Sequence, residues 1–416
     1  MAVKIGIERT GEDSPPLRKN RDFSLLWGSQ AASQLGSAVS ILAFPLLVLS
    51  IDGSAVQAGA VGTVQAVIRA VFQLPAGALT DRWDRKRLML GCDAGRAALF
   101  AILAAAILTD RASLPLVFAI SGAAAFMDVL FGPAETAAIS QLVPAERISE
   151  AFAKNEARSY MASLAGPSLG GFVYGLGRAM PFLFDALSYV ISLISIAAIR
   201  KPLQQASGNR EDSSLVSAIR EGIHYVARSP FLRSVILVAT PVNFALVAAQ
   251  FSVTLVLSDN GYAPSVLGVA QGAIAVGGLL GAFAAAWIQR QASFYNLLLT
   301  AVSILFVLLV ASALLTGQVL MVLPLAIGLF LAPAINAALF SRLAATTPDH
   351  IRGRVISVVV LFATLAASTA PLAVGLLIER VTGVAAMTLC AAAMALSLIS
   401  TVLLPGLRSG TAGNDG

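Results

Sequence analysis

The chain has 416 residues, of which 57% are hydrophobic and only 12% are charged. Soluble domains carry about 25% charged residues, so this composition excludes a water-soluble globular protein. The net charge of +6 would suit a nucleic-acid partner, but the basic residues follow a topological pattern instead, and we expect no nucleic-acid binding.

Apolar runs fill almost the whole chain between Phe23 and Leu404. Each is long enough to cross a bilayer as a helix, which takes roughly 20 residues, whereas the strands of a membrane barrel have about 9–11. We therefore predict an all-α polytopic membrane protein. Its twelve transmembrane helices are expected at 24–50, 55–80, 88–109, 113–143, 156–177, 180–199, 233–257, 263–289, 293–316, 318–346, 353–379 and 383–404.

Two polar tails are expected at the chain ends, 1–23 and 405–416. The first is too polar for a cleavable signal peptide. Of the 28 Lys and Arg residues, 23 fall in these tails and in the even-numbered loops or the helix ends beside them, and only Arg69 and Arg96 are expected deep within helices. This positive-inside bias places both termini in the cytoplasm and predicts a multi-pass protein of the plasma (inner) membrane.

The loop between helices two and three reads GALTDRWDRKRLML, residues 77–90. It resembles the cytoplasmic loop signature of the major facilitator superfamily, although Asp84 stands where that signature has its second glycine. The resemblance implies a conformational latch between the two halves of the protein, with Arg352 and Arg354 of helix eleven as partners. Alternatively, the basic residues only fix the orientation in the membrane. The predicted latch residues are Gly77, Asp81, Arg82, Arg85 and Lys86.

Five ionisable residues are expected inside the membrane. Because a charged side chain is energetically unfavourable there, each is a functional candidate. Their depth along the helices predicts a pair of Arg69 with Asp128 near the midplane. A second group, Arg96 with Asp93 and Glu135, is expected below it. Burial and a neighbouring arginine act oppositely on a carboxylate, so altered pairing would move a proton. Asp128 is the first candidate for proton coupling and Glu135 the second. The alternative is a set of permanent ion pairs that fix helix packing.

Helix five contains ASLAGPSLGGFVYG, which resembles the signature of the superfamily's antiporters. Gly166, Pro167, Gly170 and Gly171 match, and Ala162 replaces the first glycine. The proline permits a kink, and the glycines allow a neighbouring helix to approach closely. The resemblance favours export over uptake. The alternative is a packing motif without directional meaning.

A polar stretch, 200–232, divides the chain into bundles of six helices each, 24–199 and 233–404. Within it, Leu215, Ile219, Ile223 and Val226 share one helical face, which predicts an amphipathic helix at the cytoplasmic surface.

The two bundles resemble each other in sequence. Pro133 aligns with Pro333 at an offset of 200 residues, and Pro167 with Pro371 at an offset of 204. Such parallel repeats place a transport site at the interface of the halves.

Further segments, including FLFDALSYVIS in helix six, resemble the branch that contains macrolide efflux proteins and the enterobactin exporter. In this superfamily, helices one and seven line the central cavity. The corresponding residues here carry neutral hydrogen-bonding or apolar side chains, which suit an amphiphilic molecule. These predicted cavity residues are Gln30, Gln34, Phe44, Asn243, Phe244 and Gln250.

We therefore expect a monomeric secondary exporter of lipophilic or amphiphilic molecules, a drug, antibiotic or natural product, that works by proton antiport through alternating access. A siderophore or nutrient transporter of the same fold is one alternative, and a non-transporting sensor or structural membrane protein is another. No nucleophile–base pair or phosphate-binding loop is apparent in the sequence, so we expect no enzyme, no cofactor and no metal. Cys92 and Cys390 fall inside expected helices and are interpreted as packing residues.

Overall fold

The computed structural model describes residues 16–204, 215–348 and 351–407, in which every regular element is a helix. The prediction of an all-α polytopic fold is confirmed. The first half contains α1 Arg21–Asp52, α2 Ala55–Arg82, α3 Arg85–Leu108, α4 Leu114–Leu142, α5 Ile148–Leu176 and α6 Met180–Ala197. The second half contains α8 Pro230–Asp259, α9 Pro264–Gln289, α10 Phe294–Leu314, α11 Val322–Leu329, α12 Ala332–Thr346, α13 Arg352–Ala367, α14 Ala370–Arg380 and α15 Gly383–Leu403.

Side-chain caps explain several of the helix starts. The side chain of Asn20 accepts a hydrogen bond from the backbone N–H of Phe23, and that of Ser54 accepts one from Gln57. Asp84 caps α3 in the same way, through the backbone N–H of Arg87. The residue that departs from the family signature therefore starts the third helix, and its φ of −63° requires no glycine.

Eleven segments of the described chain are long and apolar enough to cross a membrane. The remaining long helix, α5, begins at Ile148 rather than at the expected residue 156 and has polar first turns. The expected helices ten and eleven are each built from two shorter helices, α11 with α12 and α13 with α14. The breaks precede Pro333 and Pro371, which lie in the first turns of α12 and α14. A proline removes one backbone donor, so these breaks lie where helical bonding is already interrupted.

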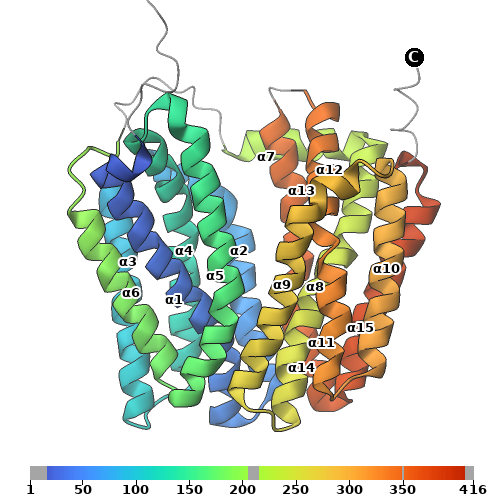
Figure 1. Cartoon of the computed structure of the whole chain (residues 1–416), viewed down its shortest axis with the longest axis horizontal. Helices are drawn as coiled ribbons and strands as arrows, with labels where there is room; N and C mark the ends of the chain where they lie inside the picture. Colours follow the sequence, from blue (N-terminus) through green and yellow to red (C-terminus); the bar gives the residue numbers. More distant parts are fainter. Residues whose placement is uncertain (1–15, 205–214, 349–350, 408–416) are drawn as a thin grey trace, which may run out of the picture.

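The helices form two bundles side by side (Figure 1). In the first, α1 packs against α5 and α6, α3 against α4 and α6, and α2 against α4. In the second, α8 packs against α13 and α15, and α9 against α11 and α12. Both α1 and α8 begin on the face where α15 ends, which we call the terminal face; the other is the opposite face (Figure 1).

Between the bundles, a short helix, α7 Leu215–Arg228, packs against α13 on the terminal face (Figure 1). Val226 is buried, Ile223 is 42% exposed, and Glu221 forms an ion pair with Arg354. The expected amphipathic helix is thus a docked element of the second half. The side chains of Leu215 and Ile219 lie outside the described residues.

The halves meet mainly through two helix pairs, α5 with α9 and α2 with α14. These pairs correspond to each other in the sequence repeat, because α5 matches α14 through Pro167 and Pro371. The contacts use the ends of the helices that lie on the opposite face, where the bundles converge (Figure 1).

Candidate functional site

Glycines allow the two halves to touch backbone to backbone on the opposite face. A Cβ added to Gly171 of α5 would lie 2.2 Å from the carbonyl oxygen of Pro264 in α9. A Cβ added to Gly375 of α14 would lie 2.3 Å from the carbonyl oxygen of Ala55 in α2. Any larger residue would force these helices apart, so the halves close here only because both positions are glycine.

The expected antiporter motif divides its contacts between two helices. Gly166 and Gly170 lie against Ala38 and Val39 of α1, whereas Gly171 faces α9 of the other half. The motif therefore holds α5 between the first bundle and the interface.

Hydrogen bonds reinforce this closure. The hydroxyl of Ser168 donates to the carbonyl oxygen of Gly268 at 3.2 Å. Glu379, near the end of α14, accepts from the hydroxyl of Ser54 at 2.7 Å and from the backbone N–H of Val56 at 2.9 Å. A carboxylate thus binds the positive N-terminus of α2 across the interface.

A central cavity of about 340 Å³ lies between the halves, directly above this closure. Both halves contribute polar groups to it, among them Arg69 and Gln250. The amide of Gln271 donates to the backbone oxygen of Gln250 at 2.8 Å and to the hydroxyl of Thr254 at 2.9 Å. Phe44 also lines the cavity, so two of the expected cavity residues, Phe44 and Gln250, meet there.

The other expected cavity residues are distributed between the two halves. Gln30 and Gln34 line a polar cavity of about 260 Å³ inside the first half. Asn243 lines an apolar cavity of about 190 Å³ inside the second half, together with Asn336 and Phe340. Phe244 packs against the hydrophobic core and lines none of the cavities described above.

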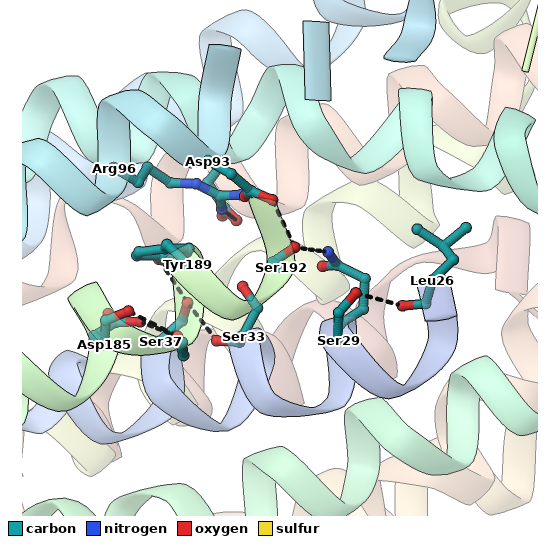
Figure 2. A network of polar contacts seen from close by, with 12 residues as sticks. Leu26, Ser29, Ser33, Ser37, Asp93, Arg96, Asp185, Tyr189 and Ser192 are labelled. Atoms are coloured by element: carbon teal, nitrogen blue, oxygen red, sulfur yellow. Dashed lines mark hydrogen bonds and ion pairs between the residues drawn. The ribbon is translucent and has the colours of Figure 1, made fainter. Parts of the chain in front are cut away.

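The first half contains a connected network of buried polar groups (Figure 2). Arg96 donates to Asp93 at 2.6 Å, and Asp93 accepts from the hydroxyl of Ser192 at 2.6 Å. Ser192 in turn accepts from the amide of Gln30 at 2.7 Å. The guanidinium carbon of Arg96 lies 4.4 Å from the centre of the Tyr189 ring. Three helices, α1, α3 and α6, are therefore joined by polar contacts inside the bundle.

Asp128 extends this network toward the interface. Its carboxylate lies 3.4 Å from Arg96 and 3.5 Å from Arg69, as expected for the latter pair. The side chain of Arg96 is only 3% exposed, whereas those of Asp128 and Arg69 are 49% and 44% exposed. Asp128 is thus the member of the network that borders open space.

Glu135 does not join Arg96 as expected. It forms an ion pair of 2.6 Å with Arg158 of α5, which also donates to the amide oxygen of Gln34 at 3.0 Å. Arg158 was missed because α5 begins earlier than the apolar pattern predicts, so a residue expected near the membrane edge lies inside the bundle. Its contact with Gln34 of α1 joins two helices and could not be inferred from spacing within one helix.

The expected latch loop contacts its own half in this conformation. Lys86 donates to the carbonyl oxygens of Ala197 and Ile199 at 3.0 and 2.7 Å, at the end of α6. Arg85 donates to the carbonyl oxygen of Leu203 at 3.2 Å. Gly77 lies in α2, and the side chains of Asp81 and Arg82 lie outside the described residues. Arg354, an expected partner, forms an ion pair with Glu221 of α7.

Charge is unevenly distributed between the halves. Among the described residues, the charged side chains that are buried all belong to the first half. These are Arg85, Asp93, Arg96, Glu135, Arg158 and Asp185. Asp185 was not predicted as a site residue, although the segment that contains it was noted for its likeness to a family pattern.

Two bundles of membrane-crossing helices around a central cavity define a transporter of the major facilitator fold. The chain belongs to the family described as transmembrane secretion effectors, whose pattern matches residues 13–412.

The chain is 30% identical over 398 residues to the multidrug efflux pump Tap of Mycolicibacterium fortuitum, covering 90% of this chain and 93% of that protein. It is 23% identical over 238 residues to macrolide efflux protein A of Streptococcus pyogenes, covering 57% and 59% of the two chains. Its fold is similar to that of a bacterial homologue of the iron transporter ferroportin in an inward-facing state. That comparison gives a TM-score of 0.73 at 13% identity and covers 94% of this chain and 99% of the other.

Proposed function

We propose that the protein is a monomeric secondary exporter of lipophilic or amphiphilic molecules that exchanges them for protons by alternating access. The observation that carries this proposal is a cavity shared by both halves and closed on one face, beside which the described residues form a buried charged network in the first half. The names of the relatives, a multidrug efflux pump and a macrolide efflux protein, support the substrate class.

The positive-inside bias indicates that the terminal face lies in the cytoplasm. We place the protein in the plasma (inner) membrane. The closed contacts of α5 with α9 and of α2 with α14 then lie toward the outside. Nearer the terminal face, α2 and α13 border a cavity of about 200 Å³ at Gln73 and Ser357. We therefore interpret this conformation as the one that accepts substrate from the cytoplasm.

The cavities suit an amphiphilic substrate. The central cavity combines apolar side chains such as Phe44 and Phe251 with the amides of Gln65 and Gln250. The cavity in the second half is almost wholly apolar apart from Asn243, Asn336 and Thr364. Apolar walls with a few hydrogen-bonding groups are typical of sites for drug-sized molecules.

Proton coupling is assigned to the network of the first half. Asp128 borders the polar cavity and pairs with Arg69, which itself lines the central cavity. A substrate that displaces Arg69 removes one of the two cations that stabilise the charged form of Asp128. Binding of substrate and binding of a proton are thereby linked through one arginine. Glu135, already paired with Arg158, is the second candidate.

The test uses everted membrane vesicles with an acidic lumen and a pH-sensitive dye. Ethidium and erythromycin are added as probes, and each transported probe should release protons from the lumen. Asp128→Asn and Glu135→Gln are assayed alone and together, with correct insertion verified for each. Probe-driven proton release that survives in the double variant would show that neither carboxylate couples transport.

A comparison of everted with right-side-out vesicles separates the alternatives. A nutrient or siderophore importer would accumulate its substrate in right-side-out vesicles instead. A non-transporting sensor would move neither probe nor proton in either orientation.

A further inference from the structure

Helix α6 presents a stripe of polar side chains to the interior of the first half. The stripe begins at Asp185, and its other members lie three, four and seven residues further along, which places them on one helical face: Ser188, Tyr189 and Ser192. Ser192 and Tyr189 belong to the network around Arg96 (Figure 2). Asp185 lies at the other end of the stripe and has no part in the ion pairs described so far.

The side chain of Asp185 is completely buried, at 0% exposure. Its Oδ2 atom has no hydrogen-bond partner. Its Oδ1 atom is 3.3 Å from the hydroxyl of Ser188, but that hydroxyl donates over a shorter distance, 2.7 Å, to the backbone oxygen of Asp185 itself. Among the described ion pairs, none includes Asp185. A carboxyl group is thus enclosed without an ion pair, and Arg96 acts on it only from beyond ion-pair distance.

The neighbouring elements do not supply the missing charge. Helix α1 contributes the neutral hydroxyls of Ser37 and Ser40 to this region; that of Ser40 donates to the carbonyl oxygen of Pro181 at 3.3 Å and also lies within interaction range of Asp185. The guanidinium of Arg96 on α3 is bound to Asp93 and Asp128, and Arg69 on α2 is bound to Asp128. The phenol of Tyr189 is hydrogen-bonded with Ser37 at 2.8 Å. Each nearby cation is therefore already engaged by another carboxylate.

An unpaired carboxylate in such surroundings is costly, and the neutral acid avoids most of this cost. The neutral acid also has an O–H that can donate. In this conformation the chemistry of the site therefore favours a proton on Asp185.

The proton has a route to the rest of the network. Asp185 lines a cavity of about 220 Å³ whose other polar walls include Asp128, Arg69 and Tyr189. This volume is large enough for several water molecules, which need only about 10–15 Å³ each by the same measure, and its polar walls can bind them. Asp128 in turn borders the 260 Å³ cavity, and Arg69 the central one.

Helix α1 closes the other side of Asp185. A Cβ on Gly36 would lie 2.7 Å from the Asp185 Oδ1 and 2.5 Å from the Ser188 hydroxyl. The same helix lines the central cavity through Phe44 and Pro45. A shift of α1 during transport would thus change the surroundings of Asp185 directly.

We propose that Asp185 is a proton-binding site of the transport cycle, which exchanges its proton with Asp128 across the 220 Å³ cavity. The O–H bond of Asp185 breaks, water in the cavity carries the proton, and a new O–H bond forms on Asp128 in place of its ion pair with Arg69. The proton then leaves through the cavity that Asp128 borders. This inference rests on the proposed proton antiport and names a carrier for it.

The first test needs no substrate. Infrared difference spectra of the purified, membrane-reconstituted protein are recorded over a pH titration, for the wild type, Asp185→Asn and Ser188→Ala. We expect a carbonyl-stretch band of a protonated carboxylic acid that persists to neutral pH in the wild type and in Ser188→Ala but is lost in Asp185→Asn. A band that remains in Asp185→Asn overturns the proposal. Should Asp185→Asn fail to fold, Asp185→Glu must shift the band, and an unshifted band has the same meaning.

The second test uses the ethidium-driven proton flux. We expect Asp185→Asn to lose proton release and uphill transport, at least tenfold, while it still exchanges ethidium down its gradient. Ser188→Ala is expected to retain both. Undiminished coupling in Asp185→Asn would refute only the role of Asp185. Absence of proton flux in the wild type would refute the proposed antiport, and the infrared result would then decide whether Asp185 binds a proton.

Discussion

The closure between α5 and α9 provides a quantitative prediction, through the substitution Gly171→Ala. The added Cβ would lie 2.2 Å from the carbonyl oxygen of Pro264 and 2.8 Å from the Cα of Gly268. Ordinary contact begins at 3.4 Å, so the two helices must separate by roughly 1 Å at this point. Both partners are backbone atoms, and no side-chain rotation can relieve the overlap.

Overpacking of this kind costs about 1–3 kcal/mol. The cost applies only to the conformation in which α5 and α9 touch, because the clash disappears when the opposite face opens. The population ratio should therefore shift toward the open form by about 5- to 150-fold.

The assay measures the distance across the opposite face by double electron–electron resonance. Spin labels are placed at Arg178→Cys and Ala263→Cys, two exposed positions that flank the α5–α9 contact, with Cys92 and Cys390 replaced. Gly175→Ala is the matched control, because it makes the same change on α5 with nothing within 4 Å of the new Cβ. If Gly171→Ala gives the same distance distribution as Gly175→Ala, the closure does not depend on the glycine contact.

Three further predictions concern other contacts. Glu379→Gln weakens the binding of α14 to the N-terminus of α2. It should shift the population ratio toward the open form by only about twofold to fivefold, measured with the same spin labels. An unchanged distance distribution would show that this carboxylate does not stabilise the closure. Glu135→Gln leaves the buried Arg158 without its charged partner and should lower the free energy of unfolding by about 3–5 kcal/mol. The double change Glu135→Leu with Arg158→Met should recover most of this loss, and additive losses would contradict a coupled pair. Lys86→Ala removes two hydrogen bonds to the end of α6 and should lower the local stability there by about 1 kcal/mol. The measurement is amide hydrogen exchange at Ala197 and Ile199, which should become faster, and Arg87→Ala on the same turn serves as the control.

The sequence by itself determined the helices and their approximate ends. Lipid offers the backbone no hydrogen-bond partners, so a long apolar run has to be a helix whatever its neighbours are. Turn chemistry was equally local: Asp84 caps α3 through a residue three positions away. Local composition gave the wrong start for α5, whose first turns are too polar to be recognised as part of a membrane helix. These turns are helical nonetheless, and they pack within the bundle.

Only the tertiary structure decided which charges meet. Glu135 could have paired with Arg96 by its depth in the membrane, but Arg158 of α5 lies closer and binds it at 2.6 Å. The isolation of Asp185 is a property of α1, α3 and α6 together, because the nearby arginines are bound to other carboxylates. Electrostatic pairing depends on distances between helices, and spacing along a single helix does not contain them. The closure on the opposite face was likewise decided by tertiary structure, because Gly171 and Gly375 are required only by the backbone that each contacts in the other half.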